Sequence, residues 1–174
     1  MFKSLAFAAA GMVVSGAAAA HTGGEHVHSF VDGFAHPFTG LDHLLVMVAV
    51  GIYAARAMTM PLALPAVFVG FMAGGAVLGM AGVPIAFAEA GILASVAVMA
   101  VLAAAGRLVP PLYVVPVVAA FAVLHGFAHG AEMAQGADPR AYGAGFVLAT
   151  ALLHGVGIAL GLLVRRRQRP APAP

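Results

Sequence analysis

Residues 36–51 read HPFTGLDHLLVMVAVG, so a polar cluster passes directly into an apolar run. Proline suits the first position of a helix, because its missing N–H would be unpaired there in any case. The stretch therefore predicts a helix that begins at Pro37, with His36 at its mouth. Asp42 and His43 then lie one to two turns inside the apolar run. Ionisable side chains inside a membrane segment are costly, and by default they mark a functional path.

The composition is that of a membrane protein. Of the 174 residues 63% are hydrophobic and 8% are charged, and the mean hydropathy is +1.03, whereas roughly 25% of the residues of a soluble domain are charged. We therefore expect an all-α integral membrane protein, a compact bundle in contact with the lipid bilayer. The net charge of +2 gives no reason to expect a nucleic-acid partner. The chain has no cysteine, which excludes disulfides and thiolate metal sites and leaves histidine, carboxylate, methionine or backbone oxygen as metal ligands.

The N-terminus has the three parts of a secretory signal peptide. Lys3 supplies the positive charge, residues 5–14 form a short apolar run, and residues 17–20 are small, as signal peptidase requires. We expect cleavage after Ala20. Cleavage after Ala18 and retention of the segment as a further membrane helix are the alternatives.

Five apolar segments follow, each near the roughly 20 residues that a spanning helix needs. They cover residues 37–55, 61–81, 84–105, 110–131 and 140–164. The predicted fold is thus a compact bundle of five transmembrane helices after an N-terminal signal peptide. Its parts are the signal peptide at 1–20, a His-rich leader at 21–35, the transmembrane domain at 36–165 and a disordered tail at 166–174.

Small residues spaced four apart let membrane helices approach closely. Four such pairs occur in the apolar segments: Gly70 with Gly74, Gly75 with Gly79, Gly126 with Gly130, and Gly157 with Gly161. We expect these pairs to lie at helix–helix contacts.

The leader contains His21, His26 and His28. A short His-rich tract suggests metal capture, and a solvated segment without a role is the alternative. If cleavage falls after Ala18, the new amino group, two amides and His21 make a square-planar nitrogen set suited to Ni(II) or Cu(II).

Arginine positions predict the orientation in the membrane. If the mature N-terminus is outside, the first and third connections and the C-terminus are inside. Those regions hold Arg56, Arg107, Arg165, Arg166, Arg167 and Arg169, and Arg140 remains outside. The pattern requires an odd number of helices after the signal, which agrees with five.

The fourth segment carries a stripe of ionisable side chains. His125, His129 and Glu132 are four and three residues apart, so on a helix they fall within about 60°. Two imidazoles and a carboxylate on successive turns can converge on one divalent cation, and hydrogen bonding between helices is the alternative. Glu89 stands alone in the third segment, either as a ligand or as a protonated acid bonded to a neighbouring helix.

The topology gathers these groups at one depth. The first and third helices begin outside and the fourth ends there, so the groups share an outer slab, about 8 Å below the outer end. The predicted metal-site residues are His36, Asp42, His43, Glu89, His125, His129 and Glu132, with secondary contacts at His21, His26, His28, Met47 and His154. Met47 lies one turn below His43. His154 lies about 20 Å into the fifth helix. Its two alternative roles, a polar contact between helices and part of an exit path for the ion, are equally supported.

Two motifs carry a resemblance to a known family. They are HPFTGLDH at 36–43, followed by Met47 and Gly51, and HGFAHGAE at 125–132. With the signal and the helix pattern, they resemble the HupE/UreJ family of bacterial nickel permeases accessory to hydrogenase and urease. After Glu132 the chain reads Met133-Ala134, where we expect a nearby proline in relatives.

The resemblance implies uptake of Ni²⁺, with Co²⁺ as an alternative, across the bacterial inner membrane. The leader and mature N-terminus would then be periplasmic and the C-terminus cytoplasmic. It also implies metal-handling roles for His36, Asp42, His43, Glu89, His129 and Glu132, with weaker support for His125.

We therefore expect a secondary or potential-driven nickel permease, not an enzyme, with no permanently bound cofactor and no catalytic residues. It would supply a nickel metalloenzyme through hydrogenase or urease maturation. The chain has no phosphate-binding loop for ATP. One alternative is a membrane-embedded His/Asp metal-dependent hydrolase, and another is a b-type haem carrier with paired histidines. The sequence leaves open nickel, cobalt or zinc, the coupling ion, and whether the protein is a homo-oligomer.

Overall fold

The structure is a computed structural model that describes residues 29–133 and 137–167. Within these ranges the chain is helical and contains no strand. The helices are α1 (Ser29–Thr39), α2 (Leu41–Ala57), α3 (Ala63–Met80), α4 (Ala88–Ala105), the short η1 (Gly106–Leu108), α5 (Pro111–Glu132) and α6 (Pro139–Arg167). The all-α class is confirmed. The predicted signal peptide, the histidines at 21, 26 and 28 and the tail beyond 167 lie outside the described residues.

The helices have the length and composition of a five-span membrane protein. Four helical segments are each long and apolar enough to cross a membrane: α3, the combined Ala88–Leu108 segment, α5 and α6. α1 and α2 together make a fifth span if the bent pair is counted as one. The predicted bounds of the last four helices agree with the structure to within four residues, because proline, glycine and arginine interrupt the apolar runs at each connection.

The first predicted helix, 37–55, is wrong in its start and its shape. Pro37 lies inside α1, which already begins at Ser29 and so includes residues assigned to the leader. The chain breaks at Gly40, which has extended backbone angles, and α2 leaves at 79° to α1. Proline removes a backbone donor near the end of α1, and the Thr39 hydroxyl donates to the His36 carbonyl at 2.8 Å.

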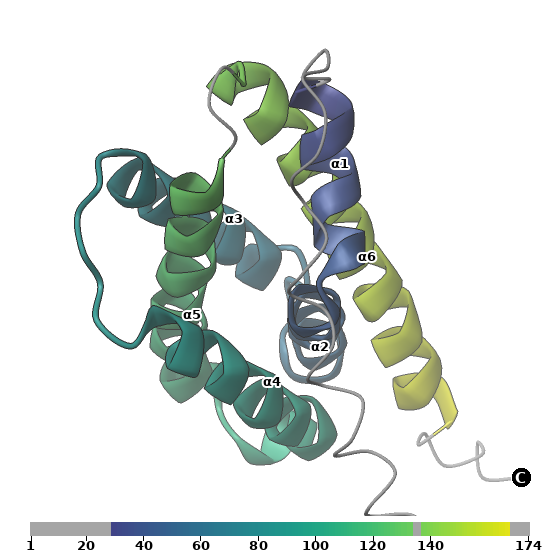
Figure 1. The fold of residues 1–174 in the computed structure, drawn as a ribbon. Helices are drawn as coiled ribbons and strands as arrows, with labels where there is room; N and C mark the ends of the chain where they lie inside the picture. Colours follow the sequence, from purple (N-terminus) through teal and green to yellow (C-terminus); the bar gives the residue numbers. More distant parts are fainter. Residues whose placement is uncertain (1–28, 134–136, 168–174) are drawn as a thin grey trace, which may run out of the picture.

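α1 lies beside the first part of α6 (Figure 1), and α2 packs on the later part, so the broken pair and α6 meet in the same order along the chain. At one end the backbone N–H of Asp138 donates to the Ser29 hydroxyl at 2.9 Å. At the other end Arg165 donates to the Ala55 carbonyl at 3.1 Å. α3 and α5 form a second pair, also parallel, and α4 packs against both α2 and α5. The first span is thus parallel to the fifth, and the second is parallel to the fourth. This arrangement is expected when successive spans cross the membrane in alternating directions.

Three of the four predicted small-residue pairs lie at close helix contacts. A Cβ on Gly75, Gly79, Gly126 or Gly130 would collide with the backbone of the other helix of the α3–α5 pair. Gly157 and Gly161 are in the same situation against α2. Gly70 and Gly74 differ, because a Cβ on either would meet nothing within 4 Å. That pair faces away from the described part of the chain.

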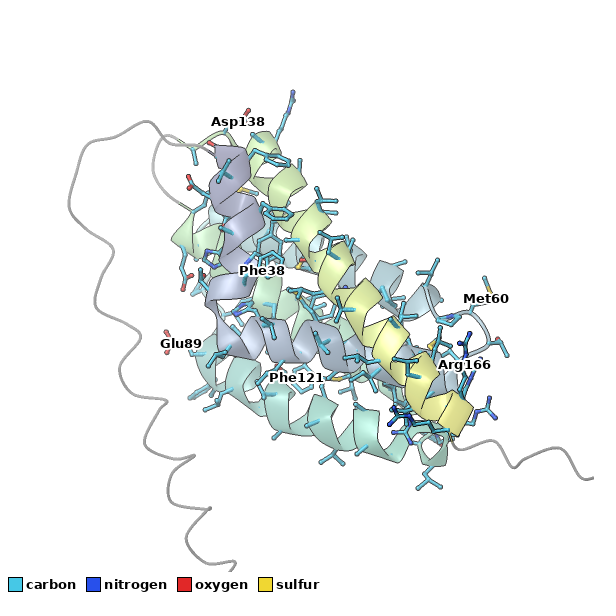
Figure 2. All side chains as sticks on the ribbon, turned by 90° about the vertical axis from the view of Figure 1, so that its right-hand side faces the viewer. Phe38, Met60, Glu89, Phe121, Asp138 and Arg166 are labelled. Atoms are coloured by element: carbon cyan, nitrogen blue, oxygen red, sulfur yellow. The ribbon has the colours of Figure 1, made fainter. Side chains whose placement is uncertain are left out.

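All the described arginines except Arg140 gather at one end of the bundle. Arg56 donates to the carbonyls of Ala103 and Ala104 at the end of α4, and Arg107 donates to the Arg56 carbonyl at 3.1 Å. Cations at helix C-termini bind the carbonyls that the helix leaves unpaired. Figure 2 shows the nitrogen atoms gathered around Arg166, with Asp138 and Glu89 on the opposite side of the molecule. The bundle therefore has one cationic end and one end where the α1–α2 bend, Glu89 and Glu132 lie.

Candidate metal centre

Four histidines from three helices meet beside the α1–α2 bend. His36 comes from α1, His43 from α2, and His125 and His129 from α5. The His129 ring centroid lies 4.6 Å from that of His36 and 4.4 Å from that of His43. The His43 and His125 centroids are 4.8 Å apart. We call these four side chains the imidazole cluster. The bend lets His36 approach His129 directly, which a straight helix through Pro37 would not explain.

Three of the four imidazoles in the cluster are buried and His36 is half-buried. His125 is fully buried, His129 is 4% exposed and His43 is 9% exposed. Nε2 of His43, Nε2 of His125 and both nitrogens of His129 have no hydrogen-bond partner among residues 29–133 and 137–167. A buried polar atom without a partner costs about 1–3 kcal/mol, so four of them in one place indicate a site shaped for a ligand.

Asp42 positions His43. Its Oδ1 accepts the Nδ1–H of His43 at 2.8 Å and the backbone N–H of the same residue at 2.9 Å. An ionised carboxylate only accepts hydrogen bonds, so Nδ1 carries the proton and Nε2 keeps its lone pair. A histidine held in this way by a carboxylate is the arrangement usual for metal ligands. The structure therefore gives Asp42 an orienting contact, where the sequence analysis predicted a ligand.

His125 is fixed in the same tautomer by a different partner. Its Nδ1 lies 2.8 Å from the carbonyl oxygen of Phe121, one turn earlier in α5. The carbonyl only accepts, so Nδ1 carries the proton and the buried Nε2 lone pair is free. His43 and His125 thus both present Nε2 as a potential ligand atom, one from each side of the cluster.

Glu132 adds a carboxylate to the outer part of the cluster. One ligand atom each from His36, His129 and Glu132 lie within 4.8 Å of one another. Ligands on opposite sides of a metal ion with bonds near 2.1 Å are about 4 Å apart, so a small inward movement of these side chains would bring them onto one ion. Two imidazoles and a carboxylate suit Ni²⁺, Co²⁺ or Zn²⁺ without selecting among them.

Glu89 lies beside this trio and not within it. It is exposed in the first turn of α4 and shares with Glu132 the lining of an open hollow of about 440 Å³. The other lining side chains are apolar, including Phe87, whose backbone is left-handed and which is 85% exposed. The hollow therefore puts two carboxylates at the outer approach to the imidazole cluster.

Two of the predicted secondary metal contacts, Met47 and His154, lie among the described residues, and they differ in their surroundings. Met47 is fully buried in the core, and His154 is buried in α6 beyond the ring of Phe68. Phe68 and Phe146 were not predicted, yet the Phe146 centroid lies 4.3 Å from that of His129. A single phenylalanine in an apolar helix carries no sequence signal that separates it from an ordinary core residue.

Comparisons with known proteins identify the family of this chain. The family model described as HupE / UreJ protein matches residues 8–173. A curated relative, Protein HupE of Rhizobium leguminosarum bv. viciae, is 38% identical over 158 residues, which cover 88% of this chain and 81% of the relative. No solved structure gives a significant match. The match over nearly the whole chain, including both histidine motifs, shows that this protein belongs to the HupE/UreJ family.

Proposed function

We propose that the protein is an inner-membrane permease for Ni²⁺, with Co²⁺ as an alternative cargo, that supplies a nickel metalloenzyme such as hydrogenase or urease. The observation that carries the proposal is the imidazole cluster with its four unpartnered, buried ring nitrogens. Family membership supports the same cargo, since the chain belongs to the HupE/UreJ family and its resemblance to that family implies nickel handling for hydrogenase or urease.

The ion would pass from carboxylates to imidazoles. Glu89 and Glu132 in the outer hollow attract a hydrated cation. The ion bound to Glu132 then gains His36 and His129 as ligands. His43 and His125 offer the next ligand atoms. Conduction requires several sites, each weak enough to release the ion. The His36–His129 and His129–His43 pairs share His129 and provide such a sequence of sites. Their nitrogen atoms can replace the water ligands of the ion one at a time.

The arginine end supports inward transport. Cytoplasmic segments carry an excess of arginine, so the end with Arg56, Arg107 and Arg165 would face the cytoplasm and the cluster would face the periplasm. A divalent cation that moves inward gains about 4.6 kcal/mol per 100 mV of membrane potential. That energy is sufficient for uptake against a large gradient without a coupling ion.

Transport explains the site better than hydrolysis does. A membrane hydrolase would need a substrate cleft beside the metal, as well as an open coordination position for water. Apart from Glu89 and Glu132, the hollow at Glu132 is lined by apolar side chains, which offer no polar groups to orient a substrate. We therefore propose no catalytic role for these residues.

Uptake of radioactive nickel by cells that lack their own nickel importer tests the proposal. Cells expressing the chain should accumulate Ni²⁺ above the empty vector, and His129→Ala should abolish the difference at equal membrane level. Leu93→Ala, which changes an exposed apolar side chain of α4, is the matched control and should behave as wild type. Competition with cobalt and zinc gives the order of preference. No accumulation by correctly inserted wild-type protein would refute the proposal.

A further inference from the structure

His154 and Thr150 form a second group of unpartnered polar atoms. His154 is 1% exposed and Thr150 is fully buried. Within the described part of the chain, both ring nitrogens of His154 and the hydroxyl of Thr150 lack a hydrogen-bond partner of good geometry, although the His154 ring lies near the backbone carbonyl of Thr150 one turn earlier. The two residues are four apart in α6, so their side chains lie on the same face of the helix. Buried threonine hydroxyls in helices commonly bond to the carbonyl one turn earlier, and here that bond is absent.

Packing between helices does not account for this pair. A histidine that joins two membrane helices needs a polar partner on the neighbouring helix. On the α2 side the neighbour is Gly51, where a Cβ would collide with the His154 carbonyl. On the α3 side the neighbour is Phe68, whose ring centroid lies 5.2 Å from that of His154. Neither neighbour offers a polar side chain, so the polar contact that the sequence analysis left open is not made among the described residues.

Phe68 connects this pair to the imidazole cluster. Its ring centroid is 5.9 Å from that of His125 and 5.2 Å from that of His154. The phenyl side chain is fully buried. An aromatic ring attracts a cation through its face but cannot coordinate it. Phe68 therefore contacts both polar groups, and each of them has unpartnered ring nitrogens.

We propose that His154 and Thr150 form a second, weaker binding site for the transported divalent cation, next to Phe68 and nearer to the arginine end than the imidazole cluster. The inference rests on the proposed transport function and adds a second station to it. One imidazole and one neutral hydroxyl are fewer and weaker donors than the cluster provides, which suits a site that must release its ion. From His154 to Arg165 the helix rises about 16 Å towards the arginine end.

The binding test uses the full-length protein in lipid nanodiscs and Ni²⁺ as the probe. Titration by calorimetry with metal analysis should give two classes of site in the wild type. Thr150→Val keeps the shape of the side chain and should weaken the second class about tenfold, and His154→Ala should remove it. Both variants should leave the tighter class unchanged. Leu153→Ala removes a buried apolar side chain next to His154 and is the control for packing loss.

Transport kinetics supply a second readout. His154→Ala should lower the maximal rate of nickel uptake with little change in the half-saturating concentration, while His43→Ala should lose tight binding. If His154→Ala does not fold, Thr150→Val decides alone. A wild type with a single class of site, or a second class whose affinity is unchanged in Thr150→Val, overturns the inner site and leaves the cluster in place. Absence of all nickel binding and uptake would instead show that the proposed function has failed.

Discussion

At the scale of single residues, the hydrogen bonds around the cluster decide which nitrogen atoms are available. Asp42 and the Phe121 carbonyl hold the protons of His43 and His125 on Nδ1, so that both Nε2 atoms are free. The sequence predicted that these residues belong together, because their spacing and topology place them at one depth. It did not predict the orienting role of Asp42, since adjacency in sequence does not reveal whether a carboxylate contacts the metal or a neighbouring ring.

Substitution of Asp42 tests this orienting role. Asp42→Ala leaves the Nδ1 of His43 without its acceptor, and we expect nickel uptake to fall close to background. Asp42→Asn retains an oxygen acceptor but not the charge, and the half-saturating nickel concentration should rise about tenfold. Uptake measured over a range of nickel concentrations distinguishes the loss of transport in Asp42→Ala from the weaker nickel affinity in Asp42→Asn. Wild-type kinetics in Asp42→Ala would contradict the orienting role.

The two outer glutamates should respond differently. Glu132 has a ligand atom close to His36 and His129, whereas Glu89 lines only the hollow. Glu132→Gln removes a charged ligand, so uptake should be nearly abolished at all nickel concentrations. Glu89→Gln weakens attraction of the hydrated ion, so uptake should be lost at low nickel and recover substantially at high nickel. Equal defects at high nickel would place Glu89 in the binding site itself.

At the scale of helices, the α1–α2 bend is the feature that sequence reasoning missed. Pro37 was interpreted as the first residue of a helix, but α1 continues through it because contacts with α6 stabilise the preceding turns. Gly33 makes one of these contacts, and its backbone packs on that of Tyr142. Tertiary packing of this kind leaves no local sequence pattern. The later helices were predicted well because each is a continuous apolar run between turn residues.

A glycine pair near this contact tests whether α1 must stay close to α6. A Cβ at Gly33 would collide with Tyr142, whereas a Cβ at Gly143 would meet nothing within 4 Å. Gly33→Ala should shift His36 away from His129 and weaken nickel binding. Gly143→Ala should bind nickel as wild type does. Calorimetric titration of both variants measures the effect, and unchanged affinity in Gly33→Ala would show that the position of α1 is unimportant.

Adjacent glycines in α3 provide a stability test. Gly75→Ala places a methyl group against the backbone of Val123 in α5, while Gly74→Ala points into open space. We expect Gly75→Ala to lower the melting temperature by separating α3 from α5. Gly74→Ala should leave it unchanged or raise it, since alanine favours a helix by up to about 1 kcal/mol over glycine. Thermal unfolding in detergent compares the two, and the reverse order would contradict the α3–α5 contact.

At the scale of the whole molecule, the bundle separates its charges. Arginine side chains bind helix carbonyls at one end, and the carboxylates and imidazoles lie at the other. The sequence predicted this separation from the arginine positions and from the number of apolar segments. The contacts of aromatic side chains with the polar groups, such as those of Phe68 with His125 and His154, could not be predicted. They depend on how helices that are distant in the sequence pack together.

Reporter fusions test the orientation that this separation implies. A reporter active only in the cytoplasm should work when it follows Arg167, at the arginine end. The same reporter should fail when inserted after Glu132, at the end with the carboxylates. A reporter active only in the periplasm serves as the control with the opposite expectation. The reverse pattern would turn the imidazole cluster towards the cytoplasm and contradict capture from the periplasm.

The central claim is that the imidazole cluster binds the transported metal directly. X-ray absorption spectroscopy of the purified full-length protein loaded with one equivalent of Ni²⁺ tests it. We predict a first shell of nitrogen and oxygen with the outer-shell scattering of several imidazole rings, reduced in His129→Ala and unchanged in Leu93→Ala. A spectrum without imidazole scattering, or one with a sulfur ligand from a methionine such as Met47, would contradict the claim.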